Sequence, residues 1–247
     1  MKIKTYHSIL SQTKTLSAII IAATIIFSIG CSAGTSPGGG SEDGSFTTLD
    51  GTKLSGHVFG SGEVGVILSH TRYTTQEAWW PFARILEDKG YKVLAYDFRG
   101  FRDSEGSFDI DSMYRDTEAA ITFMRDTGTS TIFLIGAGIG GTASIKAAIN
   151  QDIAGIITIS SSPQVETLDV RGDMREIHSP TLFIASREDG FYARSVDFLH
   201  QNAPDPKEKQ IVDGDSHGIA MLSEDAGPRV QGAILDFIIR HTPGLLQ

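Results

Sequence analysis

Apolar residues in this chain fall into short runs that alternate with segments of helical period. From residue 64 onward, each apolar run is followed by a stretch in which apolar residues recur every three or four positions. Near-continuous apolar strands separated by helices predict an α/β fold with a mostly parallel central sheet and helices on both faces. Strands are expected at Val64–Ser69, Lys92–Tyr96, Thr131–Ile135, Gly155–Ser160, Thr181–Ala185 and Lys209–Val212. Helices are expected at Gln76–Lys89, Met113–Thr127, Gly140–Ile149, Tyr192–Gln201 and Pro228–Arg240.

Two further patterns flank this alternation. The string SFTTLDGTKLSGHVFG alternates in polarity on both sides of Asp50-Gly51, and Asp-Gly favours a tight hairpin turn. We therefore expect an antiparallel hairpin ahead of the parallel strands. Only about 20 residues separate Ser160 from Thr181. That segment is too short for a large lid domain, so an open pocket suited to small or polar ligands is expected.

The N-terminus has the pattern of an export signal. Lys2, Lys4 and Lys14 precede the uncharged apolar run Leu16–Ile29, and Cys31, the only cysteine, follows directly. FSIGC resembles a bacterial lipobox, which implies lipidation at Cys31 and an extracytoplasmic, membrane-anchored protein. An uncleaved anchor or an ordinary secretory signal remains an alternative. The expected organisation is a signal peptide at 1–30, a lipidated cysteine with a flexible Gly/Ser linker at 31–44, and one domain at 45–247.

Charge narrows the range of partners. The formal net charge is -9, and residues 1–30 contain three lysines and no acid, so the remainder has 18 basic and 30 acidic residues, or -12. A surface of this sign argues against nucleic acid, because phosphate binding needs clustered positive charge. The expected partners are a small acyl-type molecule and, through the lipid, a membrane. We expect no cofactor and no metal.

The glycine-rich string LIGAGIGG between an expected strand and helix allows two interpretations. Gly136, Gly138 and Gly141 fit G-x-G-x-x-G, the dinucleotide-binding motif. Alternatively, the string is the G-x-S-x-G turn of a catalytic nucleophile with Gly138 in place of serine. The dinucleotide motif requires an acid about 20 residues further on. The next expected strand ends without a carboxylate, and the first one after it is Glu166. The motif also comes late in the chain, so the second interpretation is favoured.

Four ordered motifs resemble the α/β-hydrolase family. VILSHTR resembles its HG-type oxyanion loop, with Thr71 replacing the glycine. YDFRGFRDSEG resembles D-x-R-G-x-G-x-S-x-G, with Arg102 replacing a glycine. TLFIASREDGF and IVDGDSHG each follow an expected strand and contain Asp189 and His217. The order turn, acid, histidine is the order this fold uses. The resemblance runs from about Phe46 to the C-terminus and is closest to single-domain bacterial esterases and dienelactone hydrolases.

This resemblance implies a site in which the attacking group is missing. Asp189 and His217 correspond to the acid and base, and Gly138 corresponds to the nucleophile. Oxyanion donors are expected at the backbone amides of Ile139 and Thr71, and substrate contacts at His70 and Arg72. Glycine cannot attack a carbonyl, so acyl-enzyme chemistry is expected to be lost or strongly reduced. Glycine also reaches the strained backbone conformation of such a turn almost freely.

Structural roles compete for several of these residues. Asp189 also suits a helix N-cap, Glu188 is an alternative acid, and His217 on its own suits a solvated loop. Asp97 and Arg99 are expected to hold a turn through a carboxylate–guanidinium contact. Ser69, Ser104 and Ser161 are the candidates for a substitute nucleophile, although none of them lies at the nucleophile turn.

Three functions therefore stay open. The first is a degenerate hydrolase that now serves as an extracytoplasmic ligand-binding or interaction module. The second is an active hydrolase of small esters or lactones in which His217 and Asp189 activate water directly. The third uses a substitute serine. A dinucleotide-binding protein is the remaining alternative.

Overall fold

The computed structural model describes residues 42–149, 151–242 and 244. The expected signal segment, Cys31 and most of the expected linker lie outside the described residues. Among the described residues, no helix combines the length and apolar character needed to cross a membrane.

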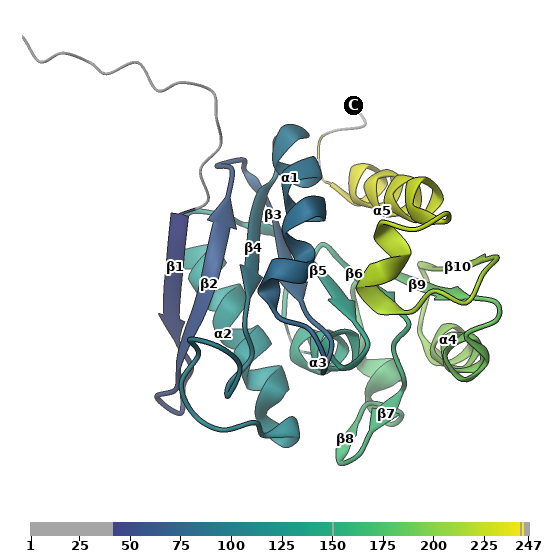
Figure 1. Cartoon of the computed structure of the whole chain (residues 1–247), viewed down its shortest axis with the longest axis horizontal. Helices are drawn as coiled ribbons and strands as arrows, with labels where there is room; N and C mark the ends of the chain where they lie inside the picture. The colour runs from purple at the N-terminus through teal and green to yellow at the C-terminus, as the bar shows by residue number, and fades with distance from the viewer. Residues whose placement is uncertain (1–41, 150, 243, 245–247) are drawn as a thin grey trace, which may run out of the picture. The chain divides into compact units, whose positions relative to one another are not determined.

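An eight-stranded sheet forms the centre of the domain (Figure 1), in the order β1-β2-β4-β3-β5-β6-β9-β10. β1 pairs antiparallel with β2 and β2 antiparallel with β4, and every further neighbouring pair is parallel. The prediction of a mostly parallel sheet is confirmed. The strands are β1 (Glu42–Thr47), β2 (Lys53–Phe59), β3 (Val64–Ser69), β4 (Lys92–Tyr96), β5 (Thr131–Ala137), β6 (Gly155–Ile159), β9 (Thr181–Ser186) and β10 (Lys207–Val212).

Helices cover both faces of this sheet (Figure 1). Apolar residues of α1 and α5 pack into one buried cluster, and those of α2, α3 and α4 pack into another. Central strands are buried on both sides, which is why they appear in the sequence as continuous apolar runs. The helices are α1 (Trp80–Asp88), α2 (Met113–Asp126), α3 (Ile139–Ala148), α4 (Gly190–Asn202) and α5 (Gly227–His241).

Short elements complete the described part of the chain. Between β6 and β9 lie the two-residue strands β7 (Gln164–Val165) and β8 (Leu168–Asp169) and a 3-10 turn, η3 (Asp173–Glu176), which agrees with the expected absence of a large lid. Further 3-10 turns are η1 (Gln76–Trp79), η2 (Ile110–Ser112) and η4 (Gly218–Leu222).

Two boundaries differ from the sequence prediction for identifiable reasons. The segment expected to be one helix from Gln76 begins as the 3-10 turn η1, and the α-helix starts at Trp80 with Pro81 in its first turn. Proline is favoured in the first turn of a helix because it lacks the amide hydrogen that a later helical position would need. β1 begins at Glu42, inside the stretch expected to be linker. Its acids and glycine are rare in strands, so the sequence carried no strand signal there.

Candidate active site

The carboxyl ends of the parallel strands bring the expected site residues together. Thr71 follows β3, Gly138 follows β5, Asp189 follows β9 and His217 follows β10. Because these ends meet at the same edge of a parallel sheet, residues 146 positions apart in the chain (217 - 71) converge there.

Gly138 forms the tight turn between β5 and α3. Its backbone has φ 54° and ψ -123°, a conformation that residues with side chains rarely adopt, and its amide donates to the Ile159 carbonyl at 2.9 Å. α3 is buried on nearly every side and is built largely from small residues, so it can approach the sheet closely.

The neighbouring glycines are required by this close packing. A Cβ on Gly136 would lie 2.4 Å from the Gly140 carbonyl oxygen, and one on Gly140 would lie 2.4 Å from the Ser69 oxygen. One on Gly141 would lie 2.0 Å from Ser161 Oγ. None of these distances leaves room for a side chain, so the turn depends on three glycines besides Gly138.

Gly138 differs from these glycines because space is available beside it. A Cβ there would lie 3.6 Å from Thr71 Cβ and Cγ2 and 4.0 Å from His217 Nε2, which are ordinary contact distances. A side chain on residue 138 would therefore point toward the His217 imidazole without a steric clash.

His217 and Asp189 form a hydrogen-bonded pair. The imidazole Nδ1 lies 2.8 Å from Asp189 Oδ2, and the ring of Tyr192 lies against that of His217 with 4.4 Å between centroids. A hydrogen on Nδ1 donated to the carboxylate leaves Nε2 of a neutral ring as an acceptor on the side of Gly138. Asp189 stands at the N-cap position of α4 but makes no side-chain capping bond. Its carboxylate thus serves the histidine and not the helix.

Glu188, the alternative acid, lies in a different contact. Its Oε2 accepts a hydrogen bond of 2.6 Å from the Gly214 amide. The structure therefore pairs His217 with Asp189 and uses Glu188 to hold the loop that precedes the histidine.

The two expected oxyanion donors differ in their hydrogen bonding. The amide of Ile139 is at the first position of α3, where a backbone N–H has no partner within the helix. The amide of Thr71 donates to Thr74 Oγ1 at 3.2 Å. Thr71 also places its methyl group beside Gly138. A ligand oxygen could use the Ile139 amide directly, whereas the Thr71 amide must first leave Thr74.

His70 is buried, contrary to the expectation that it contacts a ligand. Its Nε2 accepts from the Phe98 amide at 3.1 Å, its Nδ1 donates to the Thr71 carbonyl at 2.6 Å, and its side chain is fully enclosed. Burial lowers the pKa of His70 to about 4, so the ring is neutral near pH 7. The residue holds the loop that carries Thr71, and both of its nitrogens are occupied.

Arg72 lies at the surface as a link between loops. Its guanidinium pairs with Glu166, between β7 and β8, at 2.5 Å, and lies 5.0 Å from the centre of the Phe108 ring. About a third of its side chain is exposed. A ligand contact from Arg72 is compatible with this position and would compete with Glu166.

Asp97 and Arg99 have structural roles, but the expected contact between them is wrong. Arg99 instead binds Asp116 with Nε at 2.8 Å and Nη2 at 2.7 Å, and it binds Asp50 with Nη1 at 2.9 Å. Asp97 accepts two hydrogen bonds from Gln76, and burial raises its pKa. The guanidinium joins the hairpin turn to α2, a long-range contact that the local sequence does not reveal.

The candidate substitute serines are all buried in other contacts. Ser69 Oγ bonds to the Tyr96 hydroxyl at 3.0 Å, Ser104 Oγ donates to the Asp97 carbonyl at 2.7 Å, and Ser161 Oγ donates to the Ile159 carbonyl at 3.4 Å. None of these contacts involves His217.

Ser160 supports the site, a role that no motif in the sequence indicates. It has φ 49°, and its Oγ accepts a hydrogen bond of 3.1 Å from the Gly218 amide, next to His217. The side chain is fully buried at the end of β6. Ser160 thereby fixes the start of η4 and the orientation of the histidine loop.

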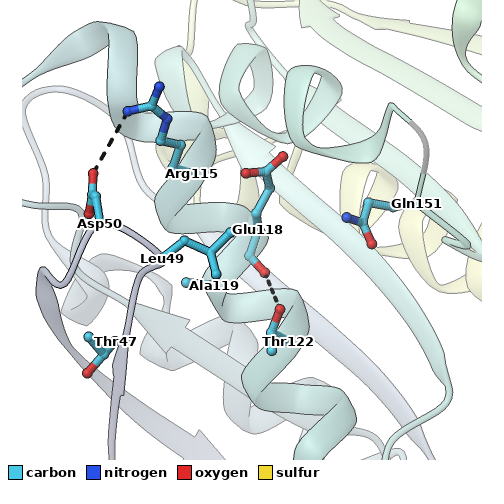
Figure 2. A pocket seen from close by; sticks show the side chains of 8 residues that line it. All are labelled: Thr47, Leu49, Asp50, Arg115, Glu118, Ala119, Thr122 and Gln151. Carbon is cyan, nitrogen blue, oxygen red and sulfur yellow. Dashed lines mark hydrogen bonds and ion pairs between the residues drawn. The ribbon is translucent and has the colours of Figure 1, made fainter.

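A separate cavity of about 410 Å³ lies between the β1–β2 turn and α2 (Figure 2). It is lined by Leu49, Asp50, Arg115 and Glu118 among others, and shares no lining residue with the Gly138 turn. Figure 2 shows Arg115 directed at Asp50, a contact of 3.9 Å. Asp50 pairs more closely with Arg99, at 2.9 Å, and the cavity is separate from the Gly138 turn.

The arrangement of sheet, glycine turn and Asp–His pair defines the class of protein. The chain has the α/β-hydrolase fold. Residues 63–174 match the model of the serine aminopeptidase family S33.

Curated relatives match part of the chain. The YfhR protein of Escherichia coli O157:H7 is 32% identical over 120 residues, covering 44% of this chain and 42% of that protein. YfhR of Salmonella typhi is 32% identical over 110 residues, covering 40% and 38%. The chain thus matches about two fifths of the length of these curated relatives.

Solved structures resemble the fold over most of its length. An esterase of Pyrococcus furiosus, Pf2001, superposes with a TM-score of 0.72 at 19% identity, covering 82% of this chain and 93% of that one. A dienelactone hydrolase of Anabaena variabilis superposes with a TM-score of 0.70 at 17% identity, covering 82% and 98%. At this level of identity the similarity establishes the fold.

Proposed function

We propose that this protein is an α/β-hydrolase-fold protein that binds a small acyl-type ligand beside Gly138 without forming an acyl-enzyme. One observation carries the proposal. The turn of a nucleophile is intact and the Asp189–His217 pair is formed, yet the residue facing Nε2 is a glycine that packing does not require. Without a hydroxyl or thiol at this position, the covalent route has no attacking atom.

The oxyanion side of the site supports the same conclusion. Stabilising an oxyanion requires donors already aimed at the position where charge develops. Here the Thr71 amide is engaged by Thr74 Oγ1, and the Thr71 methyl lies next to the turn. A ligand can use the free Ile139 amide and the half-exposed His217 for binding, while the machinery for turnover is incomplete.

A second candidate function rests on the intact Asp–His pair. A water molecule between Gly138 and His217 Nε2 could give its proton to the imidazole and attack an ester or lactone directly, as the carboxylate of Asp189 stabilises the imidazolium. Serine hydrolases deprived of a triad member keep roughly 10³- to 10⁴-fold catalysis over water. This route therefore predicts slow turnover that depends on His217.

The experiment that separates these functions compares the wild type with Gly138→Ser and Gly138→Ala. A fluorophosphonate probe that reacts with activated serines should label only Gly138→Ser, and Gly138→Ala is the matched control for the added Cβ. Hydrolysis of short 4-nitrophenyl esters is measured in parallel. Equal labelling of wild type and Gly138→Ser would contradict the proposal, because it would reveal another nucleophile.

The wild-type ester rate decides between binding and direct water attack. A rate indistinguishable from that of His217→Ala supports binding without turnover. A wild-type rate that falls to background in His217→Ala supports the second candidate. The activity of Gly138→Ser serves as the positive control that the pocket accepts the ester.

A second proposal concerns the cellular location of the protein. We propose that Cys31 is lipidated and that the domain acts outside the cytoplasm on a membrane anchor. In cells fed radiolabelled palmitate, the wild type should become labelled and Cys31→Ala should not. Labelling of both proteins, or of neither, would contradict this localisation.

A further inference from the structure

A carboxylate of α2 lines the cavity between the β1–β2 turn and that helix (Figure 2). It belongs to Glu118, and among the described residues no hydrogen bond or ion pair reaches its oxygens. Arg115, one turn earlier on the same helix, is directed at Asp50 instead. Glu118 is partly buried, and this burial raises the pKa of its side chain because the ionised form loses water. A cation in the cavity would replace part of the lost hydration.

The other acid of this cavity, Asp50, is already neutralised. Arg99 donates to Asp50 Oδ2 from Nη1 at 2.9 Å. Thr48 and Thr52 donate to the other carboxylate oxygen through their hydroxyl groups. These bonds hold the pKa of Asp50 well below its usual value, so its carboxylate is both ionised and satisfied. A ligand cation that enters the cavity therefore meets Glu118 as the acid that is open to it.

Thr122 places a second oxygen next to Glu118. The two residues are four positions apart on α2, so their side chains share one face of the helix. Thr122 Oγ1 donates its hydrogen to the Glu118 backbone carbonyl at 3.0 Å (Figure 2), which leaves its oxygen as an acceptor. A primary ammonium group carries three donors and no acceptor. It therefore matches this pair of oxygens, whereas a carboxylate ligand would be repelled by Glu118.

Leu49 gives the cavity an apolar wall. Its side chain is fully exposed, and a ligand that covered it would gain the free energy of removing hydrocarbon from water. Ala119, which is buried, lines the cavity from α2. The volume of about 410 Å³ lies within the roughly 300–1,000 Å³ typical of small-molecule sites. The cavity thus suits a short aliphatic body attached to the ammonium group.

We propose that this cavity binds a small primary amine with a short aliphatic body. The ammonium group contacts the Glu118 carboxylate and Thr122 Oγ1, and the body lies against Leu49. The net charge of -9 also favours a cationic ligand over an anionic one. Neither Gly138 nor His217 lines this cavity, so the inference does not depend on the proposed function.

Three five-carbon probes that differ in their charged or polar group test the proposal: pentylammonium, pentan-1-ol and pentanoate. Each is titrated into the protein at pH 7 while backbone amide NMR signals are recorded. Pentylammonium should bind at least about tenfold more tightly than pentan-1-ol, the lower end expected for a hydrogen bond to a charged group. Its binding should shift the signals of Glu118 and Thr122 and leave that of His217 unchanged.

A substitution of Glu118 isolates the effect of the charge. Glu118→Gln keeps the shape of the side chain, so pentylammonium should bind this variant no more tightly than pentan-1-ol does. Asp126→Asn removes an exposed carboxylate at the end of α2, outside the cavity, and is the matched control. It should bind pentylammonium as the wild type does.

Substitutions of Leu49 isolate the effect of the apolar wall. In the wild type, affinity should rise from ethylammonium to pentylammonium by up to about fourfold per methylene. Leu49→Ser should flatten this rise, and Leu49→Met, which keeps an apolar side chain, should retain it. Because Leu49 is fully exposed, both variants should fold as the wild type does.

Four results would overturn the inference. Equal pentylammonium affinity of the wild type and Glu118→Gln would exclude the carboxylate, and a rise with chain length that Leu49→Ser retains would exclude the apolar wall. Tighter binding of pentanoate than of pentylammonium would refute the ligand class. Pentylammonium that shifts the His217 signal and not that of Glu118 would assign the amine to the other site. None of these results bears on the labelling of Gly138→Ser, so the proposed function is tested independently.

Discussion

Adding a side chain at Gly138 should destabilise the fold through backbone strain alone. The φ of 54° lies where residues with a Cβ are strained by about 1–3 kcal/mol. Alanine also lowers the entropy of the unfolded chain, which offsets about 0.4–1 kcal/mol. Neighbouring atoms lie at 3.6 Å and beyond, so no overpacking is added. We expect Gly138→Ala to lower the unfolding free energy by about 1–2 kcal/mol.

Gly140→Ala provides the contrast. Its Cβ would lie 2.4 Å from the Ser69 oxygen and 2.5 Å from the His70 oxygen, and both are backbone atoms that cannot move without shifting β3. We expect a loss of at least about 3 kcal/mol, at the upper end of overpacking costs. Gly138→Ser should lie between the wild type and Gly138→Ala, because a hydroxyl near His217 Nε2 recovers about 0.5–1.5 kcal/mol.

Equilibrium unfolding in urea measures the unfolding free energy of the wild type, Gly138→Ala, Gly138→Ser and Gly140→Ala, and thermal melts measure their Tm. For a domain of this size, Gly138→Ala should lower Tm by about 2–8 °C, from 2–4 °C per kcal/mol. If Gly138→Ala proves as damaging as Gly140→Ala, space beside residue 138 does not exist. If Gly138→Ala is as stable as the wild type, the turn does not store strain, and the explanation for glycine at this position fails.

Three further predictions concern pH and the Asp–His pair. His70 has a folded pKa of about 4, below its ordinary 6.5, so it contributes stability that is present above pH 6.5 and is lost as pH falls toward 4. Melting curves of His70→Gln should lack that loss. A His70→Gln curve with the same pH dependence as the wild type would contradict this role of His70. Hydrogen bonds from Arg99 and Thr48 hold the pKa of Asp50 well below 3.8, so stability is lost as pH falls below 3.8 through the folded value. Thermal melts of Asp50→Asn from pH 2 to 7 should show a flatter acid limb, and a limb as steep as that of the wild type would refute the assignment. In Gly138→Ser, adding Asp189→Asn should lower kcat for short esters on the order of 10⁴-fold, whereas Glu188→Gln should change it little.

Hydrophobic pattern was sufficient to predict the strands and helices of the sheet layers. Strands buried on both faces and amphipathic helices leave a signal in the local sequence, so Val64–Ser69 and Lys92–Tyr96 match the structure at both ends. The strands β7 and β8 have two residues each, too few to show an alternation. Contacts that depend on tertiary packing could not be predicted from the sequence either, as the Arg99 bonds to Asp50 and Asp116 demonstrate.

The candidate site was predictable where chain order and spacing specify it. Asp189 and His217 could be found because each follows a strand, and the structure joins them at 2.8 Å. His70 precedes Thr71 in the sequence, but whether a side chain next to a loop points into the core or into the pocket depends on packing from other segments. Phe98 and Phe101, whose rings enclose His70, supply that packing. Ser160 acts through Gly218, 58 residues away, which no local pattern indicates.

The three packed glycines around residue 138 also make this turn a host for attacking groups that a glycine cannot supply. Because Gly136, Gly140 and Gly141 hold the turn through close packing, its shape does not depend on which group residue 138 carries. A cysteine, or a synthetic nucleophile introduced at this single position, would be presented to an imidazole that is already oriented by a carboxylate. Protein engineers could thus compare attacking groups in one frame whose unsubstituted form has no side chain at residue 138.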